Sequence, residues 1–252
     1  MSDQALAGKV AFVAGGYGGI GEAVARALAQ RGAIVVIAGR NVTKAQALAA
    51  SIEGASAVAM DVQDVASIRA AVESAATRLG SIDFLVNCAG TQAIEPLVDV
   101  TEQAFDRVLD VNLKAAMFLA QAVARVQIAA GRGGRHVHLL SVRAQLGMRD
   151  RGYSAYCSSK GGLSQLVKQH AVELAKHGIN VNGVAPTVVR TPMARDWLGD
   201  PETYRRLIER IPLGRIAEVD DVSGPVLFFL GAASAFVTGQ VLYVDGGITA
   251  CQ

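Results

Sequence analysis

Short runs of consecutive apolar residues alternate along the chain with longer stretches in which apolar residues recur at helical spacing. Seven runs predict strands, at 9–14, 33–38, 57–60, 82–87, 136–141, 179–184 and 240–244. The longer stretches predict helices near 19–31, 42–53, 64–79, 101–130, 154–177, 201–210 and 219–232. Because most strand runs are continuously apolar, both faces of the sheet should be covered by helices. The pattern is typical of an α/β Rossmann fold with a doubly wound parallel sheet.

Composition supports a large buried core. The 252 residues are 51% apolar and only 18% charged, which excludes disorder as the main state. No linker, repeat or low-complexity tract divides the chain. We therefore expect a single domain over residues 1–252, with a substrate-loop segment at about 187–215.

Charge and length exclude several classes of protein. The chain carries 24 basic and 22 acidic residues, and its one basic cluster, at 132–135, contains glycines that predict a loop. No nucleic-acid partner is expected. Residues 1–4 do not resemble a signal peptide, and the longest apolar stretch, 225–239, is short for a membrane span. We expect a cytoplasmic protein with no membrane partner.

Cysteine and histidine spacing gives no metal site. The three cysteines are far apart and form no CxxC pair, which favours a reducing compartment. His136 and His138 lie two apart on a predicted strand, but no third ligand is spaced to join them.

A glycine-rich turn follows the first predicted strand. Gly15, Gly19 and Gly21 precede a helix, so the backbone can approach a pyrophosphate and the helix N-terminus can meet its charge. The alternative is a tight strand–helix turn without a ligand.

The end of the second strand bears on cofactor choice. NAD sites place an acidic residue there, whereas this chain has Gly39 and then Arg40, whose guanidinium suits a 2′-phosphate. The sequence therefore favours NADP(H), with NAD(H) possible; a solvated Arg40 is the alternative. Asp61, which ends the third strand, could accept a hydrogen bond from adenine or could cap the next helix.

Tyr156 and Lys160 lie one helical turn apart. An ammonium near a phenol favours the phenolate, which would move the pKa of Tyr156 toward the working range. Ser141 ends the fifth predicted strand and could bind a substrate carbonyl. Asn112 lies in the preceding long helix, where it could be catalytic or could hold a helix kink or a water molecule.

In order along the chain, these motifs resemble the short-chain dehydrogenases/reductases. The resemblance rests on glycines 15, 19 and 21, Asn87-Cys88-Ala89-Gly90, Asn112, Ser141, Tyr156-x-x-x-Lys160, Pro186-Thr187-x-x-x-Thr191 and Asp245-Gly246-Gly247. It implies a seven-stranded Rossmann sheet, a homotetramer and a catalytic set of Asn112, Ser141, Tyr156 and Lys160. Tyr156 would exchange a proton with the substrate oxygen, Ser141 would orient that oxygen, Lys160 would bind the nicotinamide ribose, and Asn112 would help hold a proton-relay water.

The motifs and the resemblance together give a set of cofactor contacts. They are Gly15, Tyr17, Gly18, Gly19, Ile20, Gly21, Arg40, Asn41, Asp61, Val62, Asn87, Ala89, Gly90, Tyr156, Lys160, Pro186, Val189 and Thr191. NADP-preferring members often carry a basic residue where this chain has Gly18, so Arg40 alone carries the cofactor prediction.

The expected substrate mouth is rich in arginine. The segments around it hold Arg143, Arg149, Arg151, Arg190 and Arg195. We expect at least three of them to face solvent or to pair with Asp150 and Asp196. Arg143 is the preferred substrate contact beside Ser141 and Tyr156, and it favours a polar, anionic substrate such as a sugar acid. Trp197 could cap the pocket or simply pack.

The sequence predicts an NADP(H)-dependent oxidoreductase of small carbonyl compounds or alcohols, of the sugar, polyol or keto-acid type. A 3-oxoacyl-carrier-protein reductase is the main alternative. It would need a basic outer patch, for which Arg132, Arg135, Lys168 and Lys176 are available. A non-catalytic NADP(H) sensor is the alternative of another class, but such a protein has no need of an intact Ser/Tyr/Lys set.

Overall fold

Seven parallel strands form one sheet in the computed structural model, which describes residues 6–149 and 151–251. The strands are β1 (Val10–Ala14), β2 (Ile34–Gly39), β3 (Ser56–Ala59), β4 (Phe84–Asn87), β5 (Gly134–Leu139), β6 (Ile179–Pro186) and β7 (Val241–Val244). Their order across the sheet is β3-β2-β1-β4-β5-β6-β7. The predicted doubly wound α/β fold is confirmed. Residues 1–4, on which the signal-peptide expectation rests, and Asp150 lie outside the described residues.

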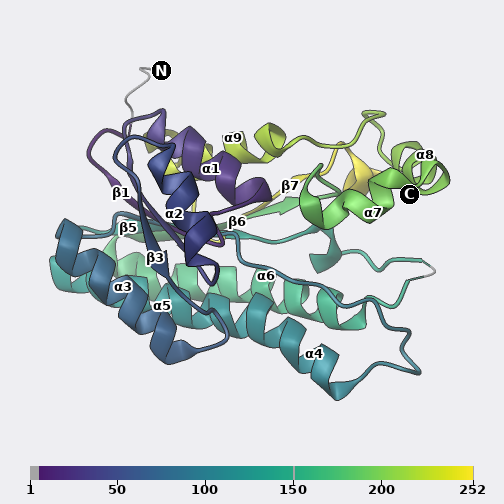
Figure 1. The fold of residues 1–252 in the computed structure, drawn as a ribbon, viewed down its shortest axis with the longest axis horizontal. Helices are drawn as coiled ribbons and strands as arrows, with labels where there is room; N and C mark the ends of the chain where they lie inside the picture. The colour runs from purple at the N-terminus through teal and green to yellow at the C-terminus, as the bar shows by residue number, and fades with distance from the viewer. Residues whose placement is uncertain (1–5, 150, 252) are drawn as a thin grey trace.

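Helices cover both faces of this sheet (Figure 1). Buried residues of α1 (Gly19–Ala29), α2 (Val42–Ala50) and α9 (Val219–Leu230) pack on one face. The other face carries α3 (Val65–Leu79), α5 (Ala115–Ala130) and α6 (Ser154–Leu174). Successive strand residues alternate between the two cores, since Phe12 packs with the α3 and α5 side and Val13 with the α1 side. The continuous apolar strand runs follow from this two-sided burial.

The long helix predicted over 101–130 is interrupted. It consists of α4 (Glu102–Leu109), a π-helical turn at Asp110–Lys114, and α5. A π turn inserts one residue into the helix, which periodicity does not reveal, and such turns often occur at functional sites.

The stretch 102–130 is also the one helix among the described residues that is long and apolar enough to cross a membrane by length and composition. The sequence predicted a helix here but placed the longest apolar stretch at 225–239, so the membrane-span length of 102–130 was not predicted. Ala115, Leu119 and Val123 are fully buried against the sheet. The helix is therefore a core element of the fold.

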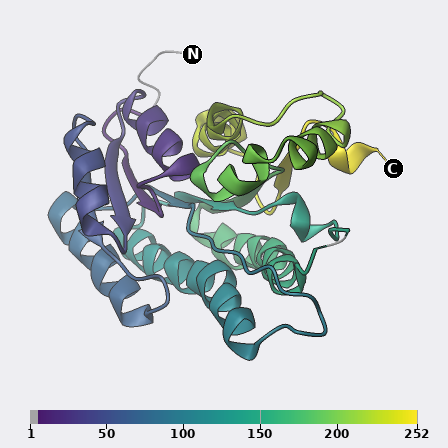
Figure 2. The same cartoon turned by 45° about the vertical axis from the view of Figure 1, so that its right-hand side comes forward.

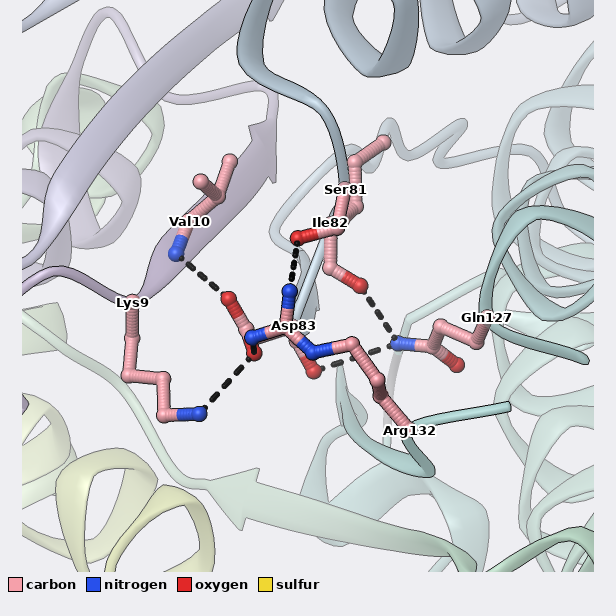
Figure 3. Close-up of polar contacts among 7 residues, drawn as sticks. All are labelled: Lys9, Val10, Ser81, Ile82, Asp83, Gln127 and Arg132. Carbon is pink, nitrogen blue, oxygen red and sulfur yellow. Dashed lines mark hydrogen bonds and ion pairs between the residues drawn. The ribbon is translucent and has the colours of Figure 1, made fainter. Parts of the chain in front are cut away.

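A polar network closes the amino edge of the sheet, opposite the strand ends that carry the motifs (Figure 3). The Asp83 carboxylate accepts hydrogen bonds from the Val10 amide at 2.9 Å and from Lys9 at 3.1 Å, and it also pairs with Arg132 at 3.4 Å. On the other side, the amide of buried Gln127 donates to the main-chain carbonyls of Ile82 and Asp83. Arg132 thus contributes to the network at the amino edge. The loop predicted over 132–135 is shorter than expected, because β5 begins at Gly134.

Strand order reverses between β1 and β4, so a crevice is expected at their carboxyl ends. The short helices α7 (Arg195–Gly199) and α8 (Pro201–Glu209) lie outside the two helical layers (Figures 1 and 2), within the expected substrate-loop segment. Helix α8 matches the prediction over 201–210, whereas α7 was not predicted.

Candidate active site

Two clefts meet at the carboxyl ends of the strands. The first is lined by the glycine-rich turn, Arg40, Asp61 and the segment after β4. The second is a cavity lined by Ser141, Tyr156, Lys160 and the segment that runs from the end of β6 to α7. The two share several lining residues, which are Ile20, Cys88, Ala89, Gly90, Thr191 and Met193. A ligand that lies along the first cleft can therefore extend into the second.

The glycine-rich turn leaves room for a ligand but none for side chains in its own interior. Gly15 has φ +71°, and a Cβ there would lie 2.8 Å from the Ala89 nitrogen. A Cβ on Gly21 would collide with the Gly15 carbonyl, whereas one on Gly18 would meet nothing within 4 Å. Gly18 precedes α1 and provides no side-chain cap for the helix N-terminus. These features fit the pyrophosphate of a dinucleotide.

The end of β2 is shaped by an aromatic ring. A Cβ on Gly39 would collide with the ring of Tyr17, so this ring fills the space that an acidic side chain would need. Exposed Arg40 and Lys44 line the same cleft, and neither forms an ion pair with the described residues. The local charge is positive, as a 2′-phosphate requires. Lys44 was missed because it lies five residues beyond the end of β2, on α2.

Asp61 lines the cleft as expected. One of its carboxylate oxygens accepts the Gln63 amide at 3.0 Å. The alternative role, capping the next helix, is filled by Asp64, whose side chain accepts from Ala66 at the start of α3.

Ser141, Tyr156 and Lys160 are brought together on one wall of the cavity. Ser141 follows β5, and the other two lie one turn apart near the start of α6. Burial raises the pKa of Tyr156, while a hydrogen bond with the Ser141 hydroxyl and the Arg143 guanidinium act in the opposite direction. The phenol therefore has two partners that favour its charged form.

Lys160 is oriented differently from the expectation. Its buried ammonium donates to the main-chain carbonyl of Leu139 at 2.8 Å and lies 5.7 Å from the Tyr156 ring centroid. Burial lowers the pKa of Lys160 to about 8, partly offset by Cys88. The prediction that Lys160 moves the pKa of Tyr156 toward the working range is therefore wrong for this arrangement. Burial raises this pKa, and the groups that act against burial are Ser141 and Arg143, since the ammonium is directed at the carbonyl.

Asn112 is fully buried in the π turn, where it joins three segments. Its Oδ1 accepts from the Thr91 amide at 2.8 Å, and its Nδ2 donates to the Thr91 carbonyl and to the Ser159 hydroxyl, each at 2.9 Å. Ser159 in turn donates to the carbonyl of Tyr156. Asn112 thus fixes the loop after β4 to the catalytic end of α6, and it does so from an irregular helical turn.

Two expected cofactor contacts lie outside the clefts. Asn87 is buried, accepts from the Ala89 amide at 3.2 Å and faces His138 at 3.4 Å, so it orients the segment that lines the cleft. Asn41 caps α2 by accepting from Lys44 and borders an adjacent hollow. The other expected contacts line one cleft or both, namely Gly15, Tyr17, Gly18, Gly19, Ile20, Gly21, Arg40, Asp61, Val62, Ala89, Gly90, Tyr156, Lys160, Pro186, Val189 and Thr191.

Of the five arginines near the mouth, Arg143 lines the cavity. Its guanidinium donates to the Gly147 carbonyl. Arg190 is exposed and pairs with Glu218 at 2.9 Å, and Arg149 and Arg195 are exposed. Arg151 lies over Trp197, 5.2 Å from the ring centroid. Of the two expected partners, Asp150 lies outside the described residues, as does the side chain of Asp196.

An aromatic wall completes the cavity. Trp197 on α7 lines it and lies 6.0 Å from Tyr153, whose ring is 5.4 Å from that of Tyr156. The Tyr153 hydroxyl donates to the Gln92 side chain. Tyr153 and Gln92 were missed because both lie in irregular loops, where spacing carries no signal.

The remaining polar candidates are packed inside the fold. His136 bonds to Gln127 at 2.9 Å, and burial lowers its pKa to about 3. His170 lies against the Met117 sulfur on α5. Within the described ranges, no three His, Cys, Asp or Glu side chains are grouped to hold a metal ion.

Known proteins share this chain's sequence and fold over nearly its full length. A family model described as enoyl-(acyl carrier protein) reductase matches residues 15–249. L-xylulose reductase of Bos taurus is 40% identical over 248 residues, 98% of this chain and 99% of its own. D-erythrulose reductase of Gallus gallus is 41% identical over 245 residues, 97% of each. A gluconate 5-dehydrogenase from Burkholderia cenocepacia J2315, solved with NADP and tartrate, is 37% identical with a TM-score of 0.94 and 99% coverage of both chains. With its sheet order and its site at the strand ends, the chain belongs to the short-chain dehydrogenase/reductase family.

Proposed function

We propose that the protein is an NADP(H)-dependent reductase of small hydroxylated ketones, interconverting them with the corresponding secondary alcohols. The observation that carries the proposal is the joint placement of Ser141, Tyr156 and Lys160 in a cavity continuous with the glycine-rich cleft. Relatives named for L-xylulose and D-erythrulose reduction support a polyhydroxylated substrate.

A bound nicotinamide supplies or accepts the hydride. In the direction of reduction, Tyr156 gives its proton to the ketone oxygen, and Ser141 donates a hydrogen bond to the same oxygen. Ser141 and Arg143 favour the negative charge that then develops on the phenol, and Lys160 is proposed to bind the nicotinamide ribose. Asn112 acts through position, because it holds the loop after β4 against α6.

NADP(H) is the preferred cofactor in this proposal. Arg40 and Lys44 provide positive charge at the end of β2, and Tyr17 takes the place of the acidic group that would select NAD(H). Arg143 is proposed to bind a carboxylate or hydroxyl of the substrate, because among the described residues it is the one arginine that lines the cavity, beside Ser141.

A carrier-protein substrate is less well supported. Arg132 and Arg135 are engaged at the amino edge of the sheet, the first by Asp83 and the second by Ser234. The cavity lies at the carboxyl edge, about 20 Å away at ~3.3 Å per strand residue. These two arginines therefore cannot surround the mouth.

The assembly is proposed to be a homotetramer in the cytoplasm. The hollow between the α4–α5 helix and α6 is lined by Leu113, Met117 and Leu166. Phe236 is fully exposed, and Leu242 on the edge strand β7 is 42% exposed. Two separate apolar surfaces match the two contacts that a tetramer needs.

The test is Tyr156→Phe, compared with the wild type in a screen of ketoses, sugar acids and acyl thioesters with both nicotinamides. We expect the wild type to reduce ketoses with NADPH and the variant to lose turnover. Trp197 is the chain's one tryptophan and lines the cavity, so its fluorescence reports dinucleotide binding, which the variant should retain. Full activity in the variant would refute the assignment of the proton donor.

A further inference from the structure

A hydrogen-bonded pair next to Tyr156 has no part in the chemistry described above. The hydroxyl of Tyr153 donates to Oε1 of Gln92 at 2.6 Å, and both side chains line the cavity. Tyr153 is buried, with 4% of its surface exposed, and immediately precedes α6. Gln92 comes from the loop after β4.

The pair lines the cavity with unused hydrogen-bonding groups of both kinds, the N–H donors of Gln92 and a lone pair of the Tyr153 oxygen. Among the residues that the structure describes, neither the Gln92 amide nitrogen nor a lone pair of the Tyr153 oxygen is used by another protein group. Burial raises the pKa of Tyr153, so it remains a neutral phenol that keeps donating to Gln92. A hydroxyl group both donates and accepts, so it can satisfy the two free positions at once. A methyl or methylene group would leave both without a partner.

The pair is also held rigidly. The Glu95 amide donates to the Gly152 carbonyl at 3.0 Å, which ties the two loops together, and a Cβ on Gly152 would collide with the Glu95 carbonyl. The Tyr153 ring is fixed between Tyr156 on one side and Trp197 on the other. A preorganised pair of this kind binds a ligand group with little loss of entropy.

We propose that Gln92 and Tyr153 form a hydroxyl-recognition subsite, which binds a substrate hydroxyl close to the reacting carbonyl and selects hydroxy ketones over plain ketones. The ring contact with Tyr156 places the subsite beside the position proposed for the carbonyl oxygen. The inference rests on the proposed function, because it assigns a second oxygen of the same substrate.

The test compares two ketones that differ by one hydroxyl, 1-hydroxybutan-2-one and butan-2-one. We expect Tyr153→Phe and Gln92→Leu each to lower kcat/KM about tenfold for the hydroxy ketone and to leave the plain ketone within about twofold. The double variant should lose little more than either single one, because both act on one hydroxyl. Val98→Ser, at an exposed position in the same loop as Gln92, serves as the matched control and should change neither rate.

Equal losses on the two ketones would overturn the inference, since the pair would then act only by positioning Tyr156. If the wild type still reduces either ketone, this result would overturn the inference but not the proposed function. Failure of the wild type to reduce both, with either nicotinamide, would instead overturn the proposed function and the inference with it. A second readout is the quenching of Trp197 fluorescence on binding of butane-1,2-diol or butan-2-ol. Both variants should weaken binding of the diol and leave binding of butan-2-ol unchanged. If Tyr153→Phe does not fold, Gln92→Leu gives the same comparison.

Discussion

The ammonium of Lys160 is fixed to the carbonyl of Leu139, at the last residue of β5, by a hydrogen bond of 2.8 Å. The lysine is buried beneath the Tyr156 ring, so its charge is held at the edge of the sheet where the phenol must change charge. Burial brings its pKa to about 8, within the range in which enzymes are assayed. The charge state of this one side chain should therefore be visible in the pH dependence of the reaction.

Ketone reduction is expected to fall as the pH rises through about 8. Lys160 is protonated below this value and neutral above it, and loss of its charge should weaken its proposed contact with the nicotinamide ribose beside Tyr156. Burial raises the pKa of Tyr156, so its own deprotonation lies at higher pH. The measurement is kcat/KM from pH 6 to 10. Lys160→Met should be slower and should lack the decline near pH 8; an unchanged decline in this variant would assign it to another group.

Cofactor discrimination should depend on both cations at the end of β2. Arg40→Ala is expected to weaken NADPH binding by roughly 1–3 kcal/mol, the loss of a charge-assisted contact, and to leave NADH almost unchanged. Lys44→Ala should act in the same direction, because it lines the same cleft. Fluorescence titration of Trp197 with each dinucleotide measures both effects. Arg69→Ala, an exposed arginine on α3, is the control; equal weakening of NADH would contradict the 2′-phosphate assignment.

Arg143 should distinguish charged from neutral substrates. In Arg143→Ala we expect KM for a keto acid to rise about tenfold or more, since a hydrogen bond to a charged group is lost, with a neutral ketose affected much less. Arg149→Ala, at an exposed position near the mouth, is the matched control. The measurement is KM for the keto acid and for the neutral ketose, from steady-state kinetics of the wild type and both variants. The same rise for both would mean that Arg143 acts through Tyr156, whose pKa it lowers.

Stability should fall in acid because of buried neutral histidines. The folded protein keeps His136 neutral down to about pH 3, whereas the unfolded chain protonates it near the ordinary value of 6.5. Between these values the unfolded state binds more protons, so the free energy of unfolding decreases as the pH is lowered, by up to about 1.4 kcal/mol per pH unit for each such histidine.

Urea unfolding at pH 7, 5 and 4 measures this slope. His136→Gln should flatten it, and His177→Gln, which replaces the one histidine outside the buried group, should not. An identical slope in wild type and His136→Gln would assign the acid sensitivity to other groups.

Much of this site could be predicted from sequence because parallel strands bring their carboxyl ends to one edge. Ser141, Tyr156 and Lys160 meet there for that reason. The Gln92–Tyr153 contact joins residues 61 positions apart in two irregular loops, for which no periodicity exists. The direction of the Lys160 ammonium depends on a main-chain carbonyl, which every residue has, so residue identity could not reveal it.

The Tyr17 ring packed over Gly39 has a consequence for redesign of the enzyme. A carboxylate at this strand end is the group that binds the ribose hydroxyl of the unphosphorylated dinucleotide. Here a side chain at position 39 would collide with the ring of Tyr17, in the glycine-rich turn after β1, so this ring would have to move or be replaced by a smaller side chain. Positions 17 and 39 are thus coupled by direct contact, and a redesign of this strand end should vary them together.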